Sequence, residues 1–239
     1  MRYFTKEWYN DTLIADMCFQ LRKNESAAVF SERFFEKLYA VEEHAYAKYV
    51  KRNAKAAKQS FDKEAAAREF AENYKENLEF VKANLPSEIL ECVKDVRILA
   101  LGTATNDVAM QITRFCGKKN RLCEAILREY NNASEQADER IGGAVAKCLL
   151  SLTGAEIVSL EQNGENATFI FNPAESAEAK ALILENAALT ESDGSLSGAA
   201  VVKYELLTAE EGGFEFSILA LNNDSSLLCV SYKISGISL

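Results

Sequence analysis

Two carboxylates and a tyrosine in the last third of the chain are the first candidates for chemistry. Tyr204, Glu205 and Glu215 lie on neighbouring predicted strands and could share one face of a sheet. Paired carboxylates are the minimum requirement for glycoside hydrolysis or for a cation site. An ordinary acidic sheet surface displays the same residues, so we favour a structural role for them. Glu205 is the first residue to test.

His44 is the only histidine of the chain, and it is therefore the only imidazole that could act as a general base near neutral pH. A di-iron helical bundle needs Glu-x-x-His motifs on two helices, and Val41 stands where the glutamate would be. A Cys–His nucleophile pair requires a thiol beside His44, and no spacing argues for one. We interpret His44 as a surface residue of a helix.

The cysteines have no pattern that indicates a metal site. They are scattered at Cys18, Cys92, Cys116, Cys123, Cys148 and Cys229, without any Cys-x-x-Cys pair. A tetrahedral zinc site needs clustered cysteine and histidine ligands. We therefore predict free thiols, no metal ligands and no cofactor. The sequence does not identify catalytic residues.

Three short motifs resemble catalytic or phosphate-binding signatures but lack their essential residues. Leu196 occupies the central position of Gly194–Gly198, where a nucleophile elbow needs serine. Ser60 and Lys63 fit Ser-x-x-Lys, but its companion motifs are missing. Gly142 and Gly143 belong to no phosphate-binding loop.

Five basic residues at helical spacing form a second feature, which we call the basic stripe. They are Lys48, Lys51, Arg52, Lys55 and Lys58. The stripe could contact phosphates, but no aromatic residues interleave with the charges, as is usual for nucleic-acid binding. A solvated face, or a surface that docks the acidic half of the same chain, is the preferred interpretation.

The first 150 residues have the periodicity of helices. Residues at spacings of three or four predict a long helix whose apolar face is buried; they are Phe30, Phe34, Leu38, Val41, Ala45 and Tyr49. Thr5 is suited to cap a first helix, and Thr103 or Thr105 to cap the helix after Gly102. Pro86 and Gly102 bound a segment that we predict to be one buried helix over 86–101. Gly117 is expected to end the following helix, and Asp95 and Arg97, two residues apart, are expected to find different partners.

From residue 154 onward apolar and polar residues alternate, which is typical of half-buried strands. Two strands near 155–162 and 165–171 flank Asn163-Gly164, a dipeptide that favours a tight hairpin turn. Further strands are expected near 180–186 and 199–208, followed by two at the end with Phe214, Phe216 and Tyr232 inward. The fold class is therefore α+β, with an N-terminal helical bundle-like half followed by a C-terminal antiparallel β-meander of about six strands. A sandwich half or an open barrel would also fit these strands.

The charge divides at the same place as the secondary structure. Residues 1–153 hold 24 Lys and Arg against 23 Asp and Glu, and residues 154–239 hold 3 against 13, so that the net charge of −9 lies in the second part. We predict an all-helical domain over 1–153 and an acidic antiparallel β domain over 154–239. An acidic surface repels nucleic acid and anionic membranes.

Three segments resemble a bacterial family from Firmicutes genomes, domain of unknown function 4085. They are the opening Met1–Tyr9, the central Leu85–Leu90 with Asp95–Thr105, and the closing strands. The resemblance implies a helical part followed by a β part, with no established activity and so no functional residues to transfer. Family members often have a His-Asp pair before the first strand, where this chain has Thr153-Gly154.

These observations favour a non-enzymatic, cytoplasmic binding or regulatory protein that acts through contact with another protein. A version of this hypothesis is an immunity-type protein that neutralises a toxin through its acidic surface. The charged N-terminus and the lack of about 18 consecutive apolar residues indicate a cytoplasmic protein without a membrane segment. The alternative is a hydrolase-type enzyme with a carboxylate, tyrosine or cysteine site in a cleft between the two halves. We expect no nucleic-acid partner, and the oligomeric state stays unknown.

Overall fold

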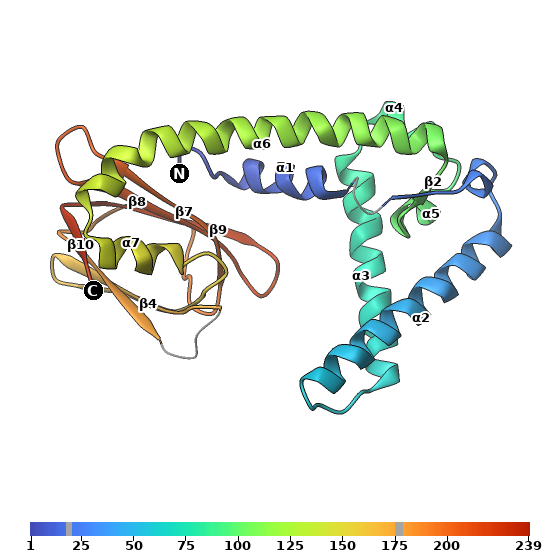
Figure 1. Ribbon diagram of the computed structural model, residues 1–239, viewed down its shortest axis with the longest axis horizontal. Coiled ribbons are helices and arrows are strands. Elements are labelled where there is room, and N and C mark those ends of the chain that lie inside the picture. The colour runs from blue at the N-terminus through green and yellow to red at the C-terminus, as the bar shows by residue number, and fades with distance from the viewer. Residues whose placement is uncertain (18–20, 175–178) are drawn as a thin grey trace. The chain divides into compact units, whose positions relative to one another are not determined.

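The computed structural model describes residues 1–17, 21–174 and 179–239, and it divides into two compact units. One unit, here called the sheet unit, comprises Met1–Asp11 and Arg121–Leu239. The other, the helical unit, comprises Thr12–Asn120. The α+β class is confirmed, with helices first and an antiparallel sheet after them (Figure 1). Within the described ranges, no helix combines the length and the apolar character needed to cross a lipid bilayer.

Among the described residues, seven α-helices precede the large sheet. They are α1 (Lys6–Met17), α2 (Glu32–Ala56), α3 (Lys63–Asn84), α4 (Ser87–Leu90), α5 (Val96–Ala100), α6 (Asn106–Arg140) and α7 (Gly143–Leu150). A 3₁₀ helix, η2 (Glu25–Ala28), and two short paired strands, β1 (Arg22–Lys23) and β2 (Thr103–Ala104), lie among them. Thr5 caps α1 as predicted, and of the two candidates Thr103 and Thr105 it is Thr105 that caps α6; their hydroxyls accept bonds from the N–H groups of Trp8 and Val108.

Helices α2 and α3 form a hairpin in the helical unit (Figure 1), and aromatic rings fill the seam between them. Tyr39 contacts Phe70 and Tyr74 edge to face, with ring centroids 5.1 and 5.2 Å apart. Phe35 and Tyr46 extend the same seam along α2. Aromatic pairs at these distances and angles attract one another beyond the effect of their burial. The seam therefore holds the hairpin together.

The segment predicted as one helix over 86–101 is two short helices, so that prediction is wrong. The chain turns between α4 and α5, and Asp95 caps α5 by accepting a bond from the N–H of Arg97 at 3.0 Å. Because Asp95 precedes the helix, its carboxylate also reaches the Arg97 guanidinium at 2.9 Å, against the expectation of separate partners. Gly102, with φ of 71°, takes the left-handed conformation expected after the helix end.

Helix α6 runs through Gly117, which was expected to end it. One glycine costs a helix only about 1 kcal/mol, and burial of Val108, Ile112 and Cys116 outweighs that cost. These residues belong to the core of the helical unit, together with Ile14, Val81 and Leu99 among others.

Within the part of the chain that the structure describes, the sheet contains eight strand segments. They are β3 (Glu156–Asn163), β4 (Asn166–Asn172), β5 (Lys180–Glu185), β6 (Ala188–Ser192), β7 (Ala200–Thr208), β8 (Phe214–Leu221), β9 (Leu227–Ile234) and β10 (Gly236–Ser238). Their order is β10-β5-β4-β3-β7-β8-β9-β6, with every pair antiparallel. The sheet therefore contains two three-stranded meanders, β3–β4–β5 and β7–β8–β9, joined between β3 and β7.

The sheet closes on itself. The pairing of Glu185 with Gly236 between β5 and β10 continues in one register into the pairing of Ala188 with Lys233 between β6 and β9. Segment β6 thus continues β5, and β10 continues β9. The β5–β6 strand therefore pairs with the β9–β10 strand, which joins the two ends of the strand order. The closure is incomplete between β3 and β7, which pair only at Glu156 and Ala200.

The inner side of this closed sheet is the core of the sheet unit. Phe169, Phe171 and Phe216 are at most 1% exposed, and α7 contributes Val145 and Leu149 to the same cluster. The predicted alternation is confirmed along β8 and β9, where the inward residues are apolar. Asn163-Gly164 joins β3 to β4 as predicted, with Gly164 at φ of 65°.

The predicted domain boundary at residue 153 falls where helices give way to strands. The contacts divide the chain elsewhere, because residues from Arg121 onward and the first 11 residues pack with the sheet. Five cysteines, all but Cys18, lie within the described residues and are free thiols. Of these, Cys92 is exposed and the other four are buried.

Candidate functional site

Glu205, the residue selected for carboxylate chemistry, is 2% exposed, and both of its carboxylate oxygens are hydrogen-bonded to the backbone of the first residues. Its carboxylate accepts bonds from the N–H groups of Arg2, Tyr3 and Phe4 at 2.8, 2.7 and 2.6 Å. Such charge-assisted bonds are strong, and they compensate the burial of the charge. Glu205 therefore anchors the N-terminal segment to the outer face of β7, and its oxygens are not available for catalysis.

Glu215 shares this outer face with Glu205, as predicted, but Tyr204 does not. Tyr204 pairs with Ile218 on the inner side and packs against the core. Glu215 is half-buried and lies 3.7 Å from the guanidinium of Arg2. The three residues proposed as one constellation are therefore split between the two sides of the sheet.

A cavity of about 440 Å³ lies beside this anchor, and its carboxylates already have partners. Besides Glu205 and Glu215 it is lined by Glu191, which lies 3.2 Å from the amino group of Met1 and accepts a bond from Ser231 at 3.3 Å. The hydrogen bond and charge of that amino group lower the pKa of the Glu191 carboxyl. These contacts fix the carboxylates as structural anions. Within the described ranges, no cluster of three or more histidine, cysteine, aspartate or glutamate residues is arranged to hold a metal ion.

Tyr130 and Cys229 are buried beside the N-terminal segment and take part in its packing. The Tyr130 ring contacts Phe4 at 4.6 Å, and its hydroxyl accepts a bond from the N–H of Leu206 at 3.3 Å. Burial raises the pKa of Tyr130 above its usual range. The thiol of Cys229 is 3.7 Å from Glu191, and burial raises its pKa as well. A neutral, buried thiol is a poor nucleophile, so Cys229 acts as a packing residue.

The other part of the molecule with an unusual surface is α2. It has 25 residues, and none of them is fully buried. The apolar face that was predicted to be buried is largely open, so that prediction is wrong: Val41 is 53% exposed and Tyr49 is 54% exposed. Phe30, just before the helix, is 63% exposed and lies against the guanidinium of Arg97. An amphipathic helix of this length normally buries its apolar face.

Three rows of residues explain this exposure. A seam row faces α3 and consists of Phe35, Tyr39, Glu42 and Tyr46. Beside it lies an apolar row of Phe34, Leu38, Val41, Ala45 and Tyr49, in which the first two are half-buried and the last three are exposed. Beyond the apolar row lies a basic row of Arg33, Lys37, His44, Lys48, Lys51 and Lys55, all exposed. Residues three or four apart share a helix face, which places each set in line.

The basic row is open to solvent, and His44 belongs to it rather than to a catalytic pair. None of its six side chains takes part in a salt bridge with the residues that the structure describes. The carboxylates of α2 lie elsewhere on the helix: Glu32 binds Arg97 at 2.8 Å and Glu42 binds Arg22 at 2.7 Å. One flank of the apolar row is therefore purely basic.

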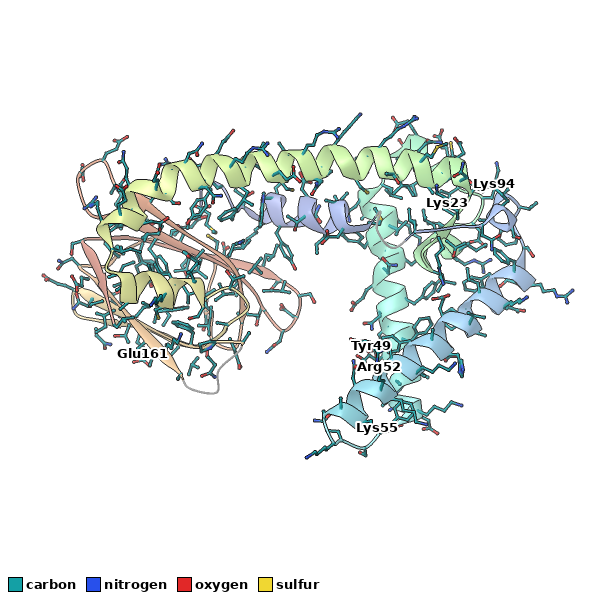
Figure 2. The ribbon with its side chains drawn as sticks, viewed as in Figure 1. Lys23, Tyr49, Arg52, Lys55, Lys94 and Glu161 are labelled. Carbon is teal, nitrogen blue, oxygen red and sulfur yellow. The ribbon has the colours of Figure 1, made fainter. Side chains whose placement is uncertain are left out.

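Aromatic rings accompany the charges at the end of α2, against the sequence-based expectation. The guanidinium of Arg52 lies 5.7 Å from the Tyr49 ring, and the ammonium of Lys51 lies 6.0 Å from the Phe61 ring. Figure 2 shows Tyr49, Arg52 and Lys55 following one another along the last turns of α2. Phe61 comes from the turn into α3, so only the tertiary structure could reveal this contact.

A second cavity, of about 400 Å³, lies on the seam side of α2. It is lined by Tyr46, Phe70 and Tyr74, and its one carboxylate, Glu42, is paired with Arg22. The hydroxyl of Tyr74 is buried without a hydrogen-bond partner among the described residues. This cavity lacks an unpaired acid or base, so the apolar and basic rows of α2 are the candidate site.

The basic stripe predicted from the sequence contained Lys48, Lys51 and Lys55 but missed Arg33 and Lys37, and the apolar row was expected to lie inside the molecule. The available signal was the spacing of Arg33, Lys37, Lys48, Lys51 and Lys55, which places these five residues on one side of the apolar row. Comparisons with protein-family models, with curated proteins and with solved structures find no match for this chain.

Proposed function

We propose that this chain is a non-enzymatic cytoplasmic protein of bacterial origin that binds another protein through the apolar row of α2. The observation that carries the proposal is a long helix without any fully buried residue, whose apolar side chains remain in line and open to solvent. Exposed apolar surface of this kind marks interaction sites in folded proteins. A helix presents such a row to a partner by contacts at positions i, i+4 and i+7.

The enzyme hypothesis loses its best candidate, because Glu205 serves to anchor the N-terminal segment. The sequence had favoured a contact surface made by the helical and acidic β halves together, with an acidic surface in the immunity-type version, whereas the proposal here places it on the helical unit. Membership of the family that the sequence resembles is a further proposal. That family has no established activity, so it neither supplies functional residues nor conflicts with a binding role.

The experiment is an affinity purification from cells that make the protein natively, with the partner quantified against the bait. The double variant Val41→Ser/Tyr49→Ser should reduce recovery of a stoichiometric partner by about tenfold, because aromatic and aliphatic anchors dominate binding energy. The control is Met110→Ser/Leu122→Ser, which changes two residues of similar exposure on another helix, at 41% and 49%. Recovery should then be unchanged.

Two results would contradict the proposal. One is that wild-type protein repeatedly recovers no stoichiometric partner. The other is that the partner is retained equally by the Val41→Ser/Tyr49→Ser variant and by the control. Because Val41 and Tyr49 are more than half exposed, circular dichroism should show that both variants keep the wild-type fold.

A further inference from the structure

The chemistry of the partner can be inferred from the flanks of the apolar row. On one side the row is closed by α3, through the seam row. On the other side it borders the basic row, where Arg33, Lys37, Lys48, Lys51 and Lys55 are exposed. A molecule that covers the apolar row must therefore also face a line of positive charge.

The shape of the surface favours a helix as the occupant. The apolar row is straight and follows positions 34, 38, 41, 45 and 49, which spans four turns of α2. A second helix packed along it would insert apolar side chains between those of α2, as in ordinary helix–helix contacts. Its own flank would then lie within a few ångströms of the basic row, where opposite charge attracts and like charge repels.

Nucleic acid and lipid surfaces fit this face less well. A phosphate backbone offers nothing to the apolar side chains of Leu38, Val41 and Ala45. An anionic bilayer in contact with α2 would also approach α3, which exposes carboxylates along its length. Four of them are Glu69, Glu72, Glu76 and Glu79. The net charge of −9 works against both of these polyanions at longer range.

A second copy of this chain is disfavoured as well. If two α2 helices packed antiparallel about a two-fold axis, the same flank of each helix would meet. The basic row would then face itself, with Arg33 of one copy near Lys48 of the other, and the like charges would repel.

We propose that the apolar and basic rows of α2 together bind an acidic amphipathic helix of a protein partner. The partner's apolar residues cover Leu38, Val41 and Tyr49, and its carboxylates pair with the basic row. This inference rests on the proposed function and specifies the chemical class of the partner.

The test uses the full chain and a synthetic probe of about 18 residues, the length of helix that spans the apolar row. The probe is a labelled helical peptide with leucines at spacings of four and three and with glutamates on both flanks of that row. A matched peptide carries lysine in place of every glutamate. Vesicles of phosphatidylglycerol and phosphatidylcholine and a short duplex RNA complete the set.

The glutamate peptide should bind saturably, and the lysine peptide should bind at least about tenfold more weakly. Raising the salt concentration from about 50 to about 300 mM should weaken binding of the glutamate peptide several-fold. The double reversal Lys48→Glu/Lys55→Glu should weaken it about tenfold. The control Lys75→Glu/Lys94→Glu changes the net charge equally at two exposed lysines outside the basic row, and should change affinity by less than about twofold.

Equal binding of both peptides, or saturable binding of the vesicles or the RNA without binding of the glutamate peptide, would overturn the inference. An unchanged affinity after Lys48→Glu/Lys55→Glu would also overturn it, as would sedimentation showing that the protein dimerises through α2. The proposed function would survive any of these results if Val41→Ser/Tyr49→Ser still abolished recovery of the cellular partner. If that partner is never recovered, both proposals fail.

Discussion

The sheet unit buries the apolar residues of its strands, whereas the α2–α3 hairpin leaves much of the apolar row of α2 exposed. In the sheet unit the alternating residues of the strands face a closed interior, where Phe169 and Phe171 have no exposed surface. In the hairpin the apolar row of α2 has nothing over Val41, which is 53% exposed. A closed sheet buries every inward residue by its own geometry, whereas a helix buries a row only where another element covers it.

The two regions also differ in how they use charge. Glu205 is buried in the sheet unit and has a donor for each of its oxygens. The basic row of α2 is exposed and stands beside apolar surface. Buried charge with complete partners serves the stability of a fold, while exposed charge in line with exposed apolar residues is suited to recognition.

The largest expected effect contrasts the two apolar sets directly. Phe169→Ala should destabilise the sheet unit by about 4 kcal/mol, because it removes a large side chain from a packed core. Val41→Ala should change stability by less than about 0.5 kcal/mol, since it removes exposed atoms and improves helix propensity. Urea unfolding measures both: Trp8, the only tryptophan, reports the sheet unit by fluorescence, and circular dichroism reports α2.

The comparison between the regions would break if Val41→Ala cost as much as a core substitution. Such a cost would mean that the apolar row is covered in the free protein, and a binding role for it would then be lost. A small cost for Phe169→Ala would instead mean that the sheet interior is loosely packed.

An intermediate effect is expected at the anchor of the N-terminal segment. Glu205→Gln replaces one acceptor oxygen by an N–H donor that faces the N–H of Arg2 or its neighbours, and should cost about 3 kcal/mol. The matched control is Glu215→Gln on the same outer face, where the carboxylate is half-exposed and should contribute less than about 1 kcal/mol. Equal costs at the two positions in urea unfolding would show that Glu205 does not hold the segment.

The smallest effect is a pH dependence confined to the sheet unit. The ammonium of Lys6, 2.9 Å from Asp193, and the N–H of Cys229 lower the pKa of the Asp193 carboxyl. A lowered pKa in the folded state gives stability that is full above about pH 4 and is lost as the pH falls through the lowered value. Asp193→Asn should therefore be less stable than wild type at pH 7, and the difference should narrow below about pH 4.

Thermal unfolding followed by Trp8 fluorescence at several pH values measures this difference. Lys6→Ala removes the basic partner of the same ion pair. Its difference in stability from wild type should also narrow below about pH 4. A difference between wild type and Asp193→Asn that stayed constant down to pH 3 would exclude the ion pair as its source.

Local signals in the sequence predicted much of the fold. Alternation identified the inward residues of β8 and β9, because the side chains of a strand point to opposite sides in turn. Asn163-Gly164 predicted its hairpin, and Thr5 and Thr105 predicted their helix starts, because a turn or a cap depends on residues only a few positions apart. Breaks within helices were harder to predict from the sequence. Asp95 caps a new helix where an apolar run had suggested one continuous helix.

The sequence by itself thus determined which residues share a strand face or a helix row, since both follow from a fixed period along the chain. Only the tertiary structure decided what covers each face. It brought the first residues onto Glu205, about 200 positions away in sequence, and so turned a candidate acid into an anchor. It also placed α3 against one row of α2 and left the next row open, because periodicity defines a face but not its neighbour.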